Sequence, residues 1–219
     1  MLLDAMHYRG LLRVVGREKG IRLYAVRGHA SLDRAARLPA AEADRRLDAL
    51  LDVVVTKYAP VPAATLSMLA RRVRYGAPQW QARIGQALAR AKARLAHARV
   101  DGVDWYWPAS ESPDTHVVDE RVRLLAPFDP IVWDRKRFEF LWGWSYRFEA
   151  YTPVSKRKLG YYALPLLWKD DVIGWANASV KGGVLTVDVG FALGDRPKSR
   201  RFTTELEAEI GRLRDFLRG

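Results

Sequence analysis

The sequence predicts an α+β protein in which helical blocks come first and a β-sheet domain follows. From Asp44 to Leu95, apolar residues recur at the three- and four-residue spacing of helices that bury one face. After Val117 the pattern changes to aromatic-rich strands with short turns between them. The chain has 219 residues, of which 49% are hydrophobic, so it can bury one or two ordinary cores.

The first block is a short helix followed by a hairpin. Residues 2–8 are amphipathic, and the strand patterns 11–15 and 21–26 flank a turn, 16–20, that glycine bounds on both sides. A helix followed by a hairpin with a basic tip is how a winged helix-turn-helix ends. We therefore interpret residues 1–30 as the end of a truncated winged helix whose first two helices are missing, and we place a domain boundary in the connector 28–43.

The second block reads as three helices and a hairpin. The first helix starts at Asp44 and ends before Pro60, the second ends near Gly76, and the third runs from Gln79. The strand pattern Val100–Trp107 follows, with a tight Asp-Gly turn. This order predicts a complete winged helix-turn-helix over residues 41–110.

The last block, residues 117–219, is expected to be a small antiparallel β-barrel-like domain. We predict strands at 146–151, 161–168, 172–180 and 184–191, joined by short turns that make them consecutive neighbours. A helix from Thr203 carries Leu206, Ile210, Leu213 and Leu217 on one side, where they can pack against the sheet.

Charge placement points to a polyanionic partner. The formal net charge is +12, and the stretch from Val53 to Val100 contains nine Lys or Arg residues with no Asp or Glu. Exposed helix faces normally mix both signs, so a one-signed domain favours a surface that contacts phosphates, and double-stranded DNA is the expected partner. The alternative is that an arginine-rich composition places Arg on every exposed helix.

Residue patterns for catalysis or metal binding are weak. Cysteine is absent, the four histidines are scattered, and neither a phosphate-binding loop nor a nucleophile motif occurs, so no cofactor and no metal are expected. Asp129, Asp134, Glu139 and Glu149 form no evident acid/base pair, and Asp129, between Phe128 and Pro130, suits a turn. No apolar run is long enough to cross a bilayer and no signal peptide is evident, so we expect a cytoplasmic protein without a membrane partner.

Three ordered blocks rich in Trp, Tyr and Pro carry a family resemblance: residues 124–137, 142–153 and 156–165. They resemble the YcaQ/AlkZ family of winged-helix DNA glycosylases, and weaker similarity covers nearly the whole chain. The resemblance implies a basic DNA channel and hydrolysis of the N-glycosidic bond, either to remove alkylated bases or to unhook interstrand crosslinks. The stretch Trp175–Ser179 departs from the family, whose members usually carry Arg and acidic residues there.

The resemblance also implies that the catalytic motif, Gln-apolar-Gln or Gln-apolar-Asp, precedes the region that aligns with His7. We therefore expect a truncated gene, a late start codon or a separately encoded N-terminal part, and no catalytic residue in this chain. Gln79-Trp80-Gln81 fits the letters of the motif, but it lies in the later helical block, where DNA contact or helix capping is the better interpretation. A winged-helix transcriptional regulator without enzymatic activity is the alternative function.

These arguments nominate fourteen DNA-binding residues from the basic hairpin tip, the second and third helices of the complete winged helix, and two basic clusters further along. They are Arg13, Arg17, Lys19, Arg71, Arg72, Arg74, Gln79, Gln81, Arg83, Arg135, Arg137, Lys156, Arg157 and Lys158.

Overall fold

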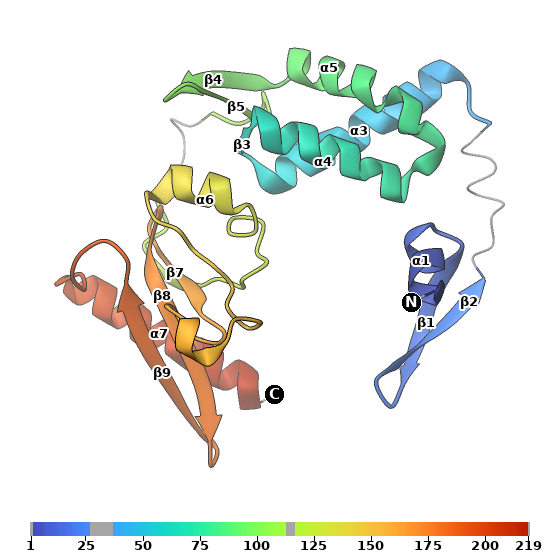
Figure 1. Ribbon diagram of the computed structural model, residues 1–219. Coiled ribbons are helices and arrows are strands. Elements are labelled where there is room, and N and C mark those ends of the chain that lie inside the picture. Colours follow the sequence, from blue (N-terminus) through green and yellow to red (C-terminus); the bar gives the residue numbers. More distant parts are fainter. Residues whose placement is uncertain (1, 27–36, 113–116, 219) are drawn as a thin grey trace. The chain divides into compact units, whose positions relative to one another are not determined.

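The computed structural model describes residues 2–26, 37–112 and 117–218, which divide into two compact units, Met1–Glu111 and Ser112–Gly219 (Figure 1). Helices and antiparallel sheets occur in both units, so the predicted α+β class is confirmed. Among the described residues, no helix combines the length and the apolar character needed to span a bilayer. Parts of the predicted connector 28–43 lie outside the described residues.

The chain starts with helix α1 (Leu2–Tyr8) and a hairpin of β1 (Leu12–Glu18) and β2 (Ile21–Val26), as predicted. The turn is shorter than expected because Gly16 lies within β1, at an irregularity in the strand register. Only Lys19 and Gly20 form the loop, both with positive φ (48° and 83°), the geometry of a two-residue hairpin turn. The Asp4 carboxylate of α1 accepts a hydrogen bond from the Tyr24 hydroxyl at 2.8 Å and so ties the helix to the hairpin.

The second block contains the predicted helices and hairpin in the predicted order. Its elements are α3 (Ala40–Tyr58), β3 (Val61–Pro62), α4 (Ala63–Gly76), the 3₁₀ helix η1 (Pro78–Arg83), α5 (Ile84–Arg94), β4 (Ala96–Val100) and β5 (Val103–Trp107). Helix α3 begins four residues earlier than expected, directly after Pro39, because the Ala-rich start 40–43 is favourable for a helix. The stretch expected to be one helix from Gln79 is a 3₁₀ turn followed by α5.

Larger apolar side chains of α3 and small side chains of α5 form the buried faces of these helices. Leu47, Leu51 and Val55 follow one another at four-residue spacing on α3 and are at most 1% exposed. Ala87 and Ala91 occupy the inward face of α5 and are fully buried. The short β3 pairs with β5 to give a three-stranded antiparallel sheet in the order β3-β5-β4, which joins the first loop of the block to its hairpin.

The second unit is built on an antiparallel half-barrel in the order β6-β7-β8-β9. These strands are β6 (Val122–Leu124), β7 (Leu164–Trp168), β8 (Asp171–Lys181) and β9 (Val184–Phe191), and helices α6 (Arg135–Trp142), η3 (Val154–Lys156) and α7 (Arg200–Arg218) complete the unit. Three of the predicted strands and the C-terminal helix are confirmed. The predicted strand 146–151 is wrong, since this segment is irregular.

Both faces of this sheet are covered. Leu166 and Leu167 are consecutive residues at an irregularity in the register of β7 with β8, and they pack against different core clusters. Phe202 and Leu206 of α7 pack with Leu166, while Phe138 of α6 packs in the cluster that Leu167 borders. Because β7 is apolar toward both sides, it can lie inside the unit.

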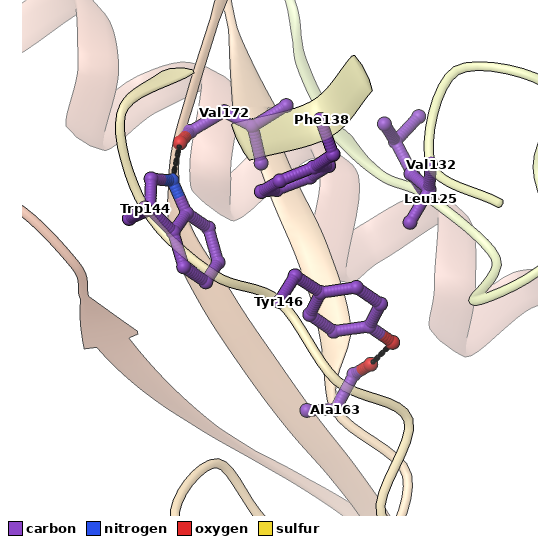
Figure 2. Packing of buried hydrophobic residues seen from close by; sticks show 7 residues of the cluster. All are labelled: Leu125, Val132, Phe138, Trp144, Tyr146, Ala163 and Val172. Atoms are coloured by element: carbon purple, nitrogen blue, oxygen red, sulfur yellow. Dashed lines mark hydrogen bonds between the residues drawn. The ribbon is translucent and has the colours of Figure 1, made fainter. Parts of the chain in front are cut away.

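Buried aromatic side chains explain why residues 146–151 do not form a strand (Figure 2). The Trp144 indole N–H donates to the Val172 carbonyl at 2.7 Å, and the Tyr146 hydroxyl donates to the Ala163 carbonyl at 2.7 Å. Phe138 contacts Trp144 edge-to-face, with 4.9 Å between ring centres. Tyr146, the first residue of the predicted strand, is instead an anchor that together with Trp144 fixes an irregular segment against the sheet.

Helix α7 covers the backbone of the edge strand β6 as well as the sheet face. The Glu209 carboxylate accepts the Leu124 N–H at 2.7 Å, and Arg212 donates to the Val122 carbonyl at 3.1 Å. Glu209 and Arg212 also form an ion pair with each other. The two side chains replace the hydrogen bonds that another strand would supply, and so protect an edge open to pairing with other chains.

Candidate nucleic-acid interface

A row of ion pairs joins α3 to η1 and α5. Asp44, Asp48 and Asp52 recur at four-residue spacing along α3 and therefore share one face of it. Arg83 contacts Asp44 at 3.1 Å, Arg90 contacts Asp48 at 2.9 Å, and Arg94 contacts Asp52 at 2.7 Å. The hydrogen bonds that Arg90 donates to Asp48, followed by the charges of Asp48 and Asp44, raise the pKa of Arg90 above its ordinary value.

These ion pairs correct the interpretation of the stretch from Val53 to Val100, which contains Lys and Arg but no Asp or Glu. Its acidic partners lie just before Val53, and the helix packing brings them to the arginines across about forty residues of sequence. Three of the nine cations are therefore balanced by the aspartates of α3, and Arg83, one of the nominated DNA-binding residues, is among them. A fourth, Arg99, lies 3.9 Å from Asp104. Its guanidinium is held by Asp44, so we leave it out of the proposed interface.

The second half of α4 carries the exposed cations Arg71, Arg72 and Arg74. Arg74 donates to the Tyr75 hydroxyl at 2.9 Å and lies 4.9 Å from the centre of its ring. That hydrogen bond, together with the positive charge of Arg74, lowers the pKa of Tyr75. Tyr75 is itself 59% exposed, so α4 ends in a basic surface with an aromatic residue at its edge.

Arg71 and Arg74 border a shallow pocket between α4 and α5 with a volume of about 380 Å³, whose other lining residues are Gln81, Ile84, Gly85 and Leu88. The exposed residues of η1 and α5 beside it, Ala82, Gly85, Gln86 and Ala89, are small or polar. A Cβ added at Gly85 would meet no atom within 4 Å. Two cations thus stand next to a smooth helical surface that a large ligand can approach closely.

The Gln79-Trp80-Gln81 sequence lies on η1. Trp80 is 7% exposed and belongs to the core, Gln79 is half-buried, and Gln81 is exposed at the pocket. Residues two apart on a 3₁₀ helix point about 120° away from each other. The two glutamines therefore do not converge on one reacting atom, and Gln81 is the better placed for contact with a ligand.

The nominated residues of the hairpin, Arg13, Arg17 and Lys19, are all exposed. Lys19 lies at the tip of the two-residue turn, and Arg17 is opposite Arg22 in the strand register. Arg22 forms an ion pair with Asp4 at 3.3 Å. The hairpin tip therefore has the exposed basic character that the sequence predicted.

In the second unit, the cluster Arg135-Lys136-Arg137 holds a turn in place. Arg135 lies 4.5 Å from the centre of the Tyr146 ring and donates to the carbonyls of Val132 and Pro127 at 2.8 and 2.9 Å. Burial lowers its pKa. Arg137 is only 2% exposed and donates to the carbonyls of Pro130 and Ile131. A phosphate cannot reach a guanidinium in this position, so the nomination of Arg137 for DNA contact is corrected to a structural role.

The cluster Lys156-Arg157-Lys158 lies in a loop organised by Glu149. This carboxylate is 6% exposed and accepts the backbone N–H groups of Lys158, Leu159 and Gly160 at 2.8, 2.7 and 3.3 Å. Burial alone would raise the pKa of Glu149, but the three backbone hydrogen bonds outweigh it and lower the pKa. Lys156 and Lys158 are exposed, and Arg157 is half-buried.

Three of the four acidic residues considered for catalysis, Asp129, Asp134 and Glu149, accept hydrogen bonds from nearby backbone N–H groups. Asp129 accepts the Ile131 N–H at 2.9 Å, the turn role that its flanking residues predicted, and Asp134 caps α6 by accepting the Arg137 N–H at 3.2 Å. Across the part of the chain that the structure describes, no three His, Asp or Glu side chains are grouped so that they could hold a metal ion.

Two kinds of structural feature were not predicted from the sequence. One is the pairing of α3 with α5, which the spacing of Asp44, Asp48 and Asp52 could have revealed. The other is a set of exposed rings: Tyr151, Tyr161 and Tyr162, which the alternating pattern assigned to strands, and Phe128, which adjoins the predicted turn at Asp129.

Residues 1–216 match the model of a family described as DNA glycosylase AlkZ-like. No solved structure matches the chain.

Proposed function

The chain belongs to the AlkZ-like DNA glycosylase family, and we propose that it binds double-stranded DNA through the basic surface formed by α4, η1 and α5. This proposal rests on the different surroundings of the arginines within residues 41–110. Arg83, Arg90 and Arg94 face the aspartates of α3, whereas Arg71 and Arg74 are exposed at the pocket that Gln81 and Gly85 line. Arg72 is exposed on the same helix. Exposed guanidinium groups beside a smooth helix suit contact with a phosphate backbone.

We further propose that residues 41–110 act as a winged helix, with α5 as the helix that approaches DNA and β4–β5 as the wing. The order helix, short strand, two helices and hairpin supports this assignment, as does the pairing of β3 with β5. The exposed Gln81 and Gln86 near the start of α5 are residue types that can bond base edges or phosphates.

The proposed role is DNA repair, with the chain as the DNA-binding scaffold of N-glycosidic bond hydrolysis. In that reaction water adds to C1′ of the sugar and the damaged base leaves, either as an alkylated base or as one end of a crosslink. We propose that the catalytic motif, Gln-apolar-Gln or Gln-apolar-Asp, comes from a polypeptide segment outside these residues. The apolar side chains exposed on α1 and the hairpin, among them Leu2 (76%), Ile21 (70%) and Val26 (74%), support a covering segment there.

The binding proposal is tested by the salt dependence of duplex affinity. A variant with Arg71, Arg72 and Arg74 all changed to Gln should bind more weakly to duplexes of any sequence. The slope of log K against log salt should also become shallower by about 0.9 for each phosphate contact that is lost. The matched control replaces Arg94, which is held by Asp52, with Gln. An unchanged slope in the triple variant, or an equal change in the control, would overturn the proposed surface.

The scaffold proposal is tested with duplex DNA that contains an N7-alkylated purine, followed by mild heat to reveal abasic sites. We expect the chain alone to release no base. Base release that disappears in Gln79→Ala or Gln81→Ala would place the catalyst on η1 and contradict the proposal.

A further inference from the structure

The loop of residues 147–162 carries exposed aromatic rings that the proposed duplex contact does not use. Tyr151 is 94% exposed, Tyr161 59% and Tyr162 47%, and Phe128 beside the loop is 67% exposed. Phe148 joins three of these rings, with centre-to-centre distances of 5.2 Å to Phe128, 6.2 Å to Tyr151 and 5.1 Å to Tyr162, each edge-to-face. Phe128, Phe148, Tyr151 and Tyr162 therefore form one connected group on the surface of the unit, and Tyr161 is the chain neighbour of Tyr162.

The same loop is basic. It contains Arg147, Lys156, Arg157 and Lys158, and its single acidic residue, Glu149, is buried with its charge directed at three backbone N–H groups. The Arg157 guanidinium lies 4.9 Å from the centre of the Tyr161 ring. The outer surface of the loop thus combines aromatic faces with positive charge and exposes no carboxylate of its own.

Hydrogen bonds hold this irregular loop in one conformation. Its two ends are joined by the bond from the Tyr146 hydroxyl to Ala163, and its interior by bonds from Arg157 to the Thr152 carbonyl (2.8 Å) and from Asn177 to the Leu159 carbonyl (2.7 Å). Gly160 has a φ of +121°, and a Cβ there would lie 2.3 Å from the Asn177 amide oxygen. A loop held in this way loses little conformational freedom when a ligand binds.

We propose that the 147–162 loop binds unpaired nucleotides of DNA, with Tyr151 and Tyr161 stacking on bases and Lys156, Arg157 and Lys158 contacting phosphates. Bases within a duplex are already stacked on their neighbours and offer no face to a protein ring, whereas unpaired bases do. Exposed aromatics interleaved with cations are the pattern of surfaces that bind single strands. Protein interfaces share the enrichment in Tyr and Arg but are depleted in Lys, so the two lysines among the loop's four cations favour a nucleic acid over a protein partner.

The inference extends the proposed function: damaged DNA with a strand opened or a base displaced offers both a duplex and unpaired nucleotides. The proposed loop site differs from the proposed duplex-binding surface in its residues and in its ligand, so an experiment can contradict either proposal without contradicting the other.

The test measures the affinity of the full chain for a labelled oligothymidine and for a labelled duplex by fluorescence anisotropy. Tyr151→Leu and Tyr161→Leu remove the stacking face and keep apolar bulk, and each should raise the Kd for oligothymidine about fivefold or more, the lower end of the effect of one stacked aromatic. Tyr151→Phe keeps the ring and should retain the affinity. The duplex Kd should stay unchanged in all three variants. The control is Phe216→Leu, which alters another exposed ring, on α7.

Unchanged oligothymidine binding in both leucine variants would overturn the inference, as would an equal loss of duplex binding or tighter binding of oligouridine than of oligothymidine. Absence of duplex binding by the unaltered chain would defeat the proposed function, while oligothymidine binding that depends on Tyr151 would leave this inference in place. Because Tyr151 is almost fully exposed, its variants should fold normally, which thermal unfolding checks.

Discussion

Arg90 on α5 holds the carboxylate of Asp48 on α3 with two hydrogen bonds, Nε to Oδ2 at 2.9 Å and Nη2 to Oδ1 at 2.9 Å. This two-pronged geometry fixes the guanidinium plane and is the strongest arrangement available to an Arg–carboxylate pair. It lies at the centre of the row of ion pairs between the two helices, with Arg83 and Asp44 on one side and Arg94 and Asp52 on the other. The pair joins helices that are far apart in sequence.

We predict that Arg90→Gln lowers the free energy of unfolding by about 1 kcal/mol, a value reduced from that of a buried charged hydrogen bond because both partners are partly exposed. Asp48→Asn should have a similar effect, and the double variant should lose less than the sum of the two. Urea unfolding of the four proteins measures this coupling. Strict additivity would show that the pair contributes nothing to stability.

The α3–α5 pairs also show which parts of the interface could be predicted from sequence. The apolar spacing of Leu47, Leu51 and Val55 predicted α3 correctly, because a buried helical face leaves a periodic trace. Counting charges between Val53 and Val100 overstated the free positive charge. The aspartates that balance Arg83, Arg90 and Arg94 belong to another element, and only the packing of the helices brings them near.

Residues 144–151 show a second limit on what the sequence pattern could predict. Trp144, Tyr146 and Phe148 alternate with polar residues as in a strand, yet the hydrogen bonds of Trp144 and Tyr146 go to backbone carbonyls of other segments, Val172 and Ala163. Alternation of apolar and polar residues indicates that side chains point to two sides. It does not indicate whether the backbone is paired with another strand. The exposed rings of the 147–162 loop were therefore not recognised as a surface.

A pair of substitutions at Gly85 separates helix stability from DNA contact. Gly85→Ala should stabilise the protein by about 0.5 kcal/mol, because glycine is unfavourable even in the first turn of a helix and the added methyl group meets open space. Gly85→Glu places a carboxylate beside Arg71 and Arg74 and should weaken duplex binding by repelling phosphates. Thermal unfolding and anisotropy measure the two effects. Ala49→Glu, at an exposed position on α3, is the control for the same change in net charge; an equal loss of affinity there would argue against a local contact.

The buried Glu149 predicts an acid-sensitive loop. Its pKa in the folded chain lies below the ordinary value of 4.5, so the carboxylate stabilises the fold fully above about that pH, and the contribution is lost as the pH falls through the depressed folded value. Glu149→Gln keeps the shape of the side chain and removes the charge. We expect it to lower stability near neutral pH and to flatten the fall in stability between neutral and acidic pH. Glu139→Gln, an exposed site on α6, is the control, and an identical acid profile for wild type and Glu149→Gln would contradict the prediction.

Tyr146 gives the opposite pH dependence. Burial raises its pKa to about 12, and the positive charge of Arg135 offsets only part of that effect. Stability from this residue is complete below the ordinary tyrosine pKa of 10 and is lost as the pH rises from there toward 12. Tyr146→Phe should cost about 1 kcal/mol at neutral pH by removing the bond to Ala163. The difference in ultraviolet titration between the two proteins isolates this residue, and a midpoint near 10 would show that the hydroxyl is reached by water.

The contact between Glu209 and β6 leads to a prediction about self-association of the protein. Its carboxylate is 15% exposed and occupies the N–H of Leu124 on the edge strand β6. Glu209→Ala should destabilise the second unit by about 1–2 kcal/mol, because the N–H loses a charged acceptor. It should also promote self-association, since an uncovered strand edge can pair with another chain. Glu207→Ala removes an equal charge from an exposed position on the same helix and should do neither. Light scattering at several protein concentrations measures the association. A Glu209→Ala protein that is less stable but strictly monomeric would show that Arg212 alone is enough to protect the edge.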